Sequence, residues 1–245
     1  MLPLQRQHDI LRLLEERRQM TVKEICAALY YSPATVRRDL TEMEGRGLLK
    51  RSFGGAVLTE HYPEQLPLAI RAAKHITAKK HLCARAAAMI CDGDTVFIDA
   101  SSTTYFLAPL LKSYKDQTVI TNNPHLSVTL SELKIHNFCT GGEMLNDSIA
   151  LVGSDTLRFI RGIRAHKCFF SARGLAEGEI SDSSKEERDV KIAMLERSTQ
   201  SYFLCDDSKR GLRFPYTVAE LSDHVHLLGE HEEPSGKSEI PTAVK

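Results

Sequence analysis

The stretch Ser32-Pro-Ala-Thr-Val-Arg-Arg-Asp-Leu40 decides the fold of the N-terminal part of the chain. Serine is favoured just before a helix, and proline suits the first helical position, where its missing N–H costs nothing. Apolar side chains recur at helical spacing at Val36, Leu40 and Met43, so one face of this helix is predicted to be buried. The sequence therefore predicts a helix that runs from this stretch to about Arg46.

Two further helices are predicted before it and a hairpin after it. Residues 4–17 carry apolar side chains at helical spacing, and residues 21–29 open with a Thr-x-x-Glu capping box. Phe53-Gly-Gly55 separates two short strand-like runs, residues 48–52 and 56–59, which predicts a hairpin. This order of elements is the winged helix-turn-helix plan, in which the third helix lies in the major groove of DNA.

The polar face of the third helix offers side chains that can read DNA. Arginine can bind guanine O6 and N7 with two hydrogen bonds, and a helix N-terminus can hold a phosphate. Basic side chains on the hairpin are placed to grip flanking phosphates. The predicted DNA-contacting residues are Ser32, Thr35, Arg37, Arg38, Lys50 and Arg51. A small helical domain with a solvated charged face is the alternative, but several local signals agree on DNA.

The rest of the chain alternates strand-like runs with helical stretches, which predicts an α/β domain with a mainly parallel sheet. Strands are predicted at residues 95–99, 118–121, 135–140, 167–171, 201–206 and 224–228. Helices are predicted at residues 74–90, 105–111, 125–133, 155–160 and 185–197. The predicted organisation is a winged helix-turn-helix domain at 1–59, a linker at 60–78, an α/β domain at 79–228 and a disordered tail at 229–245.

Polar or glycine-containing loops follow several of the predicted strands. The run Ser101-Ser-Thr-Thr104 lies between a strand and a helix, where amides, hydroxyls and the positive helix end can hold an anion. In an open α/β sheet, ligands bind beyond the carboxyl ends of the strands. The sequence therefore predicts an effector site at this edge. Its candidate residues are Asp99, Ser101, Ser102, Thr103, Thr104, Asn122, Gly141, Gly142 and Lys209.

Charge is balanced over the whole chain but not along it. The 245 residues include 32 Lys and Arg and 32 Asp and Glu. Residues 1–57 carry 10 basic and 7 acidic side chains, whereas the remainder carries 22 and 25. The zero net charge of the chain is thus the sum of a basic N-terminal region, predicted to bind DNA, and an acidic remainder. Because the basic excess is small, we expect two or more winged helices per operator, in a homodimer or homotetramer.

Composition excludes several other classes of protein. With 42% hydrophobic and 26% charged residues, the chain is typical of a soluble globular protein with a sizeable core. No apolar run approaches the ~18 residues that span a bilayer, and no secretory signal is recognisable. The six cysteines form no CxxC pair and the histidines no zinc spacing. We predict a cytoplasmic protein with free thiols, no metal, no cofactor and no membrane partner.

The N-terminal stretch resembles the signature of the DeoR family of bacterial transcriptional repressors. The match continues through Gly47-Leu-Leu-Lys-Arg51 and Gly54-Gly-Ala56, with Phe53 where a histidine is frequent. Further matches to the family's sensor domain lie at Lys79–Thr104, Thr121-Asn122, Thr140–Gly142 and Asp206–Lys209. The resemblance covers about residues 5 to 228.

The resemblance implies a sensor domain akin to ribose-5-phosphate isomerase, with phosphorylated sugars as effectors. Ser101–Thr104 would hold phosphate, and Asp99, Asn122 and Lys209 would address sugar hydroxyls or shape the site. Glu187 and Lys191 match a helix pattern of the family and are interpreted as a structural i,i+4 pair.

Two departures from the family pattern bear on the effector. Arg173 lies in Phe169-Phe-Ser-Ala-Arg-Gly174, where the family commonly has a different glycine-containing segment, and it can reshape or recharge the site. The closing His226-Leu-Leu-Gly229 also departs from the usual pattern. Arg173 therefore joins the candidate effector-binding residues.

The leading prediction is a ligand-controlled repressor of sugar-metabolism genes, not an enzyme. Its partners would be duplex operator DNA and a small effector, a phosphorylated sugar or related metabolite. The alternative is a sugar-phosphate isomerase-like enzyme with an accessory N-terminal domain, for which Asp99, Asp206 and Asp207 could abstract a proton. A sensor that responds to a protein partner is a third reading. The operator and the effector stay open.

Overall fold

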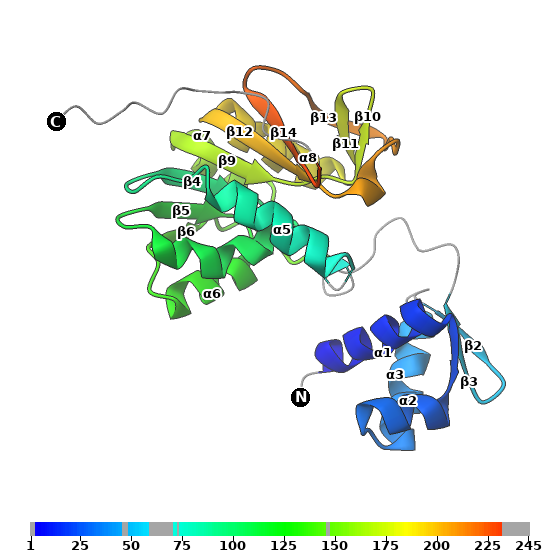
Figure 1. Ribbon diagram of the computed structural model, residues 1–245. Coiled ribbons are helices and arrows are strands. Elements are labelled where there is room, and N and C mark those ends of the chain that lie inside the picture. The colour runs from blue at the N-terminus through cyan, green and yellow to red at the C-terminus, as the bar shows by residue number, and fades with distance from the viewer. Residues whose placement is uncertain (1–2, 46–48, 59–70, 73, 146–147, 232–245) are drawn as a thin grey trace. The chain divides into compact units, whose positions relative to one another are not determined.

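A computed structural model of the chain describes residues 3–45, 49–58, 71–72, 74–145 and 148–231. The chain divides into two compact units, Met1–Ile76 and Thr77–Lys245, with separate hydrophobic cores (Figure 1). Some predicted features lie outside the described residues: the ends of the third helix and of the hairpin, most of the linker at 60–78, and the tail from residue 232. No helix in the described part is long and apolar enough to cross a membrane.

The N-terminal unit contains the three predicted helices and the hairpin. Its helices are α1 (Pro3–Arg17), α2 (Val22–Leu29) and α3 (Pro33–Gly45). Its strands are β1 (Gln19–Thr21), β2 (Leu49–Ser52) and β3 (Gly55–Leu58). The predicted capping box opens α2, with Glu24 N donating to Thr21 Oγ1 at 3.2 Å and Thr21 N donating to Glu24 Oε2 at 2.7 Å. These elements bury one core with Ile10, Leu14, Ile25, Val36, Leu40 and Met43.

Strand β1 was not predicted, and it completes an antiparallel sheet of order β1-β3-β2. The close approach of the hairpin to β1 depends on Gly55, where a Cβ would collide with the carbonyl oxygen of Met20. Only a residue without a side chain fits between the two strands there. The hairpin, or wing, is thereby held against the helical part of the unit.

The larger unit is built on the predicted parallel sheet. Its strands are β4 (Thr95–Ile98), β5 (Thr118–Thr121), β6 (Asn137–Cys139), β9 (Ala165–Phe170), β12 (Ser198–Cys205) and β14 (Val225–Gly229). They pair in the order β14-β12-β9-β4-β5-β6, and every neighbouring pair is parallel. These are the six predicted strands, so the prediction of a mainly parallel sheet is confirmed.

Helices cover both faces of this sheet (Figure 1). One face carries α5 (Ile76–Ala87), η1 (Thr104–Ser113) and α6 (Pro124–Glu132), and the other carries α7 (Ser154–Arg161) and α8 (Lys185–Glu196). Side chains alternate between the faces, with Val96 and Ile98 in one core and Phe97 in the other. The helical stretch predicted at residues 105–111 is a 3₁₀ helix, and it contains Pro109, which has no N–H to donate.

Several short elements of this unit were not predicted. β10 (Gly174–Ala176), β11 (Glu179–Asp182) and β13 (Tyr216–Glu220) form an antiparallel sheet. β7 (Glu143–Leu145) and β8 (Ala150–Val152) form a hairpin, and η2 (Asp207–Lys209) follows β12. Glu177 and Gly178 join β10 to β11 with φ of 52° and 84°, the left-handed conformation of a tight hairpin turn.

The order of strands reverses between β4 and β9. From β4 the chain builds β5 and β6 on one side, and then β9, β12 and β14 on the other. Such a reversal leaves a crevice at the carboxyl ends of the two central strands, where open α/β sheets bind ligands. Asp99 follows β4 and Ser171 follows β9, so both lie at this position, and Ser171 N donates to Asp99 Oδ2 at 3.2 Å.

Candidate functional site

The third helix, α3, presents the predicted DNA-reading side chains to solvent. Arg37 and Arg38 are exposed and Thr35 is half-buried, while Val36 on the opposite face is fully buried. Ser32 Oγ accepts the Thr35 N–H at 3.2 Å, so this serine caps the helix as predicted. Burial on one face and exposed guanidinium groups on the other is the arrangement that a major-groove helix needs.

Asp39, which sequence reasoning passed over, holds α3 against α1. It is only 1% exposed, and its carboxylate accepts hydrogen bonds from Arg6 Nη2 at 2.9 Å and from Arg6 Nε. These hydrogen bonds to Asp39 raise the pKa of Arg6, although partial burial of the guanidinium opposes that rise. The spacing offered a signal, because Asp39 lies three residues after the buried Val36 and shares the inner face of the helix.

We expect Arg6→Met to lower the stability of the 1–76 unit by about 1–3 kcal/mol, because it leaves the buried Asp39 carboxylate without its donor. Urea unfolding followed by circular dichroism measures the loss. Arg12→Met, a change at an exposed arginine of the same helix, is the matched control and should have little effect. Equal stability of the two variants would contradict the role assigned to the Arg6–Asp39 pair.

The two predicted wing residues differ in their surroundings. Lys50 is exposed on β2 and available to a phosphate. Arg51 instead packs back on α3, where its Nη1 donates to Thr41 Oγ1 at 3.1 Å and its N–H donates to Glu44 Oε1 at 2.7 Å. Arg51 therefore braces the wing on α3. At the wing tip the Phe53 side chain is fully exposed.

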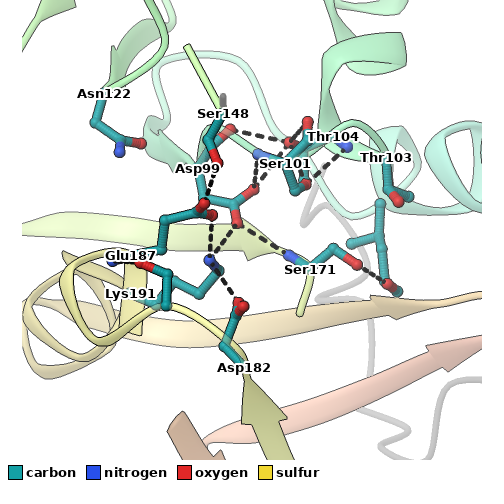
Figure 2. A network of polar contacts seen from close by, with 12 residues as sticks. Asp99, Ser101, Thr103, Thr104, Asn122, Ser148, Ser171, Asp182, Glu187 and Lys191 are labelled. Carbon is teal, nitrogen blue, oxygen red and sulfur yellow. Dashed lines mark hydrogen bonds and ion pairs between the residues drawn. The ribbon is translucent and has the colours of Figure 1, made fainter. Parts of the chain in front are cut away.

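The run Ser101–Thr104, called the hydroxyl loop below, is folded by its first and last residues (Figure 2). Thr104 Oγ1 contacts Asp99 Oδ1 at 2.9 Å and Ser101 Oγ at 2.8 Å, and Ser101 Oγ accepts the Thr104 N–H at 3.2 Å. Asp99 Oδ1 also accepts the Ser101 N–H at 3.2 Å. The hydroxyls of Ser101 and Thr104 are thus engaged within the loop, and Asp99 shapes the loop.

The two middle residues of the hydroxyl loop face lysines. Lys79 Nζ donates to Ser102 Oγ at 3.2 Å, and Lys209 Nζ donates to Thr103 Oγ1 at 3.2 Å. Lys209 Nζ also donates to Ser171 Oγ at 2.6 Å and lies 3.1 Å from Asp206 Oδ2. Two ammonium groups, three hydroxyls and one carboxylate therefore meet at the carboxyl end of the central strands. Lys79 begins the stretch that resembles the family's sensor domain, but it was not predicted as a site residue.

A buried ionic cluster lies next to Asp99 and is drawn below it in Figure 2. Lys191 Nζ lies 2.9 Å from Asp182 Oδ2, 3.2 Å from Glu187 Oε2 and 3.9 Å from Asp99 Oδ2. Glu187 in turn accepts a hydrogen bond from the Ser148 hydroxyl. The predicted Glu187–Lys191 pair is present, and the structure adds two further carboxylates to the same ammonium.

Burial and charge act in opposite directions on this cluster. Burial raises the pKa of Asp99, because the carboxylate loses its hydration, and the Lys191 ammonium only partly offsets that rise. Burial disfavours the charged form of Lys191, but the surrounding carboxylates of Asp182, Glu187 and Asp99 outweigh it and raise its pKa. Lys191 is therefore held as a cation in the interior.

The other predicted effector residues lie farther along the same edge of the sheet. Asn122 follows β5 and donates from Nδ2 to the Leu151 carbonyl at 3.0 Å, while its buried Oδ1 has no hydrogen-bond partner among the described residues. Gly141 and Gly142 follow β6, with φ of 70° and 115°, and a Cβ on Gly142 would collide with Thr156 Oγ1. Gly142 therefore allows the backbone to pack closely on α7.

Arg173 stands between β9 and β10, at the same end of the sheet as Ser171. Its N–H donates to the Ser181 carbonyl at 3.1 Å, and its side chain is half-buried. Arg173 therefore lies just beyond the carboxyl end of β9, and its influence on the effector stays a prediction.

One group of metal-ligand side chains lies near the surface. Asp207, Glu230 and His231 bring ligand atoms within 4.8 Å of one another. Their proximity has an ordinary explanation, because Glu230 Oε1 accepts the Asp207 N–H at 2.9 Å and Arg210 Nε lies 3.2 Å from Asp207 Oδ1. We assign no metal to this group.

Comparison with known proteins finds a matching domain family for each of the two units. The DeoR-like helix-turn-helix domain matches residues 6–61, and the DeoR C terminal sensor domain matches residues 74–230. Among solved structures, ribose 5-phosphate isomerase A of Methanocaldococcus jannaschii superposes with a TM-score of 0.42 at 13% identity, over 56% of this chain and 55% of that one.

Two relatives match nearly the full length of the chain. The HTH-type transcriptional regulator GolR of Listeria innocua is 31% identical over 93% of this chain and 90% of its own. The lactose phosphotransferase system repressor of Staphylococcus epidermidis is 30% identical over 97% of this chain and 96% of its own. The chain therefore belongs to the DeoR family of helix-turn-helix transcriptional regulators.

Proposed function

We propose that the protein is a repressor of sugar-metabolism genes whose affinity for its operator is set by a phosphorylated sugar or related metabolite. The observation that carries the proposal is the meeting of Lys79 and Lys209 on the hydroxyl loop, where the strand order reverses. Ammonium groups and hydroxyls suit a phosphoryl group. The unpaired Oδ1 of Asn122 offers an acceptor for a sugar hydroxyl.

The surroundings of Asp99 support binding without turnover. Its carboxylate is buried and accepts from Ser101 N, Ser171 N and the Thr104 hydroxyl. A general base needs a free lone pair within reach of the substrate proton. An Asp99 carboxylate committed to the loop supports a sensor, and the full-length relatives are named as regulators or repressors.

DNA binding by this chain is proposed to need a homodimer or homotetramer. The helix-turn-helix region carries only a small basic excess, and DNA affinity grows with the number of phosphates that basic side chains neutralise. Two winged helices on a two-fold operator would double that number.

A phosphorylated sugar that fits the site is expected to stabilise the 77–245 unit by about 2.7 kcal/mol at a concentration of 100 times its Kd. A thermal-shift screen of sugar phosphates, each paired with its unphosphorylated sugar, measures the effect. Lys209→Met and Ser102→Ala should remove most of the shift, because the first removes an ammonium group that contacts the hydroxyl loop and the second removes a hydroxyl of the loop itself.

The matched control is Lys112→Met, at an exposed lysine in the last turn of η1, which should keep the full shift. The proposal fails when sugars stabilise the protein equally with and without phosphate, or when the shift survives in both Lys209→Met and Ser102→Ala.

A further inference from the structure

Lys79 ties the hydroxyl loop to the helix that follows the boundary between the two units. The first unit ends at Ile76, and α5 begins at that residue. Lys79 stands at the end of the first turn of α5, is 4% exposed, and donates from Nζ to Ser102 Oγ. The chain that leaves the DNA-binding unit is therefore connected, within one helical turn, to the predicted phosphate site.

The first turn of α5 has poor local support of its own. It contains no acidic residue, and Lys79 and Lys80 place positive charge near the helix N-terminus, where the helix dipole disfavours it. His75, directly before the helix, adopts φ of 53°, a left-handed conformation that is uncommon outside glycine but that histidine adopts more often than most residues. An anion beside Lys79 would offset the unfavourable positive charge at the N-terminus of α5.

Two lysines and one buried carboxylate lie around the hydroxyl loop. Burial opposes ionisation of Asp206, but the charge of Lys209, the Ser208 hydroxyl and the charge of Lys79 together lower the pKa of this carboxyl group. The adjacent Cys83 thiol donates to the Thr103 carbonyl at 3.1 Å, and burial raises its pKa to about 12. It stays neutral, so it does not cancel the positive charge.

We propose that an anion on the hydroxyl loop is held by Lys79 as well as by Lys209, and that its binding orders the first turn of α5. This inference rests on the proposed function. It identifies the start of α5 as the element through which occupancy of the sensor site reaches the N-terminal unit. A ligand can shift such an equilibrium only by binding one state better, and the Lys79 contact supplies that difference.

Hydrogen–deuterium exchange of the full chain, with inorganic phosphate as the probe, tests the inference. At a phosphate concentration about ten times its Kd, exchange that requires phosphate release should slow about tenfold in both the hydroxyl loop and residues 76–82. Lys79→Met should keep slowed exchange in the loop and lose it in α5. Lys80→Met, at the exposed neighbour on the same helix, should behave like the unaltered protein.

The outcomes separate the two proposals. Slowed exchange in the loop with none at residues 76–82 of the unaltered protein overturns the inference and leaves the proposed function standing. Slowed exchange in neither segment overturns both. The result for the unaltered protein does not depend on whether any variant folds. Lys79→Arg keeps the positive charge, so phosphate should slow exchange in α5 of this variant as it does in the unaltered protein.

Discussion

Replacing Lys191 with methionine is expected to destabilise the 77–245 unit by about 3–5 kcal/mol, the usual cost of removing one partner from a buried ion pair. Lys191 is 4% exposed and faces the carboxylates of Asp99, Asp182 and Glu187. Methionine fills similar space, so the loss would come from uncompensated charge and not from a cavity. Urea unfolding near neutral pH measures it.

The loss should also depend on pH. Burial already raises the pKa of Asp99, and without the ammonium that pKa would rise further. A carboxyl group whose pKa is higher in the folded state binds an extra proton there, so its contribution to stability falls as pH rises through that pKa. The deficit of Lys191→Met should therefore be larger at about pH 8 than at about pH 5.

Lys185→Met is the matched control, since Lys185 is exposed in the first turn of the same helix. Its stability should stay within about 0.5 kcal/mol of the unaltered protein. A Lys191→Met deficit as small as that of the control, or one that shrinks as pH rises, would rule out the role assigned to the cluster.

Replacing Arg37 or Arg38 with alanine is expected to cost about 1–3 kcal/mol of affinity for the operator, the usual value of a guanine contact made by arginine. Both side chains are exposed on α3, so neither change should disturb the fold. The double variant should lose specific binding. A gel shift measures affinity on a duplex that the unaltered protein selects from a random-sequence library.

Two further variants separate base reading from general charge. Lys50→Ala, on the wing, should weaken binding to all sequences alike and lower the salt dependence by about one phosphate contact. Arg12→Ala removes an exposed arginine of α1 and should leave affinity nearly unchanged. Unaltered affinity in both Arg37→Ala and Arg38→Ala would show that α3 does not read this DNA.

The parallel sheet could be predicted from sequence because each of its strands is a short apolar run next to turn residues, as at Thr95–Ile98 and Thr118–Thr121. The antiparallel sheet could not. β13 pairs with β11, far earlier in the chain, and nothing local specifies that partner. The Glu177-Gly178 turn carried a weak signal, since asparagine or aspartate before glycine is the usual hairpin pair.

Only part of the candidate site could likewise be predicted from the sequence. The hydroxyl loop could be predicted because it lies between a strand and a helix in the sequence. Lys79 and Asp182 reach the site from α5 and β11, so only the packed fold brings them there. Asp39 was missed for a different reason, because an aspartate beside two exposed arginines looks like part of a solvated face.

The wing places two contrasting positions side by side. Phe53 stands fully in solvent at the tip, and its replacement would disturb no packing inside the protein. Gly55 admits no side chain, because the Met20 carbonyl occupies the space. Descendants of this protein can thus vary the residue at the tip without cost to the fold, whereas Gly55 has to be inherited unaltered.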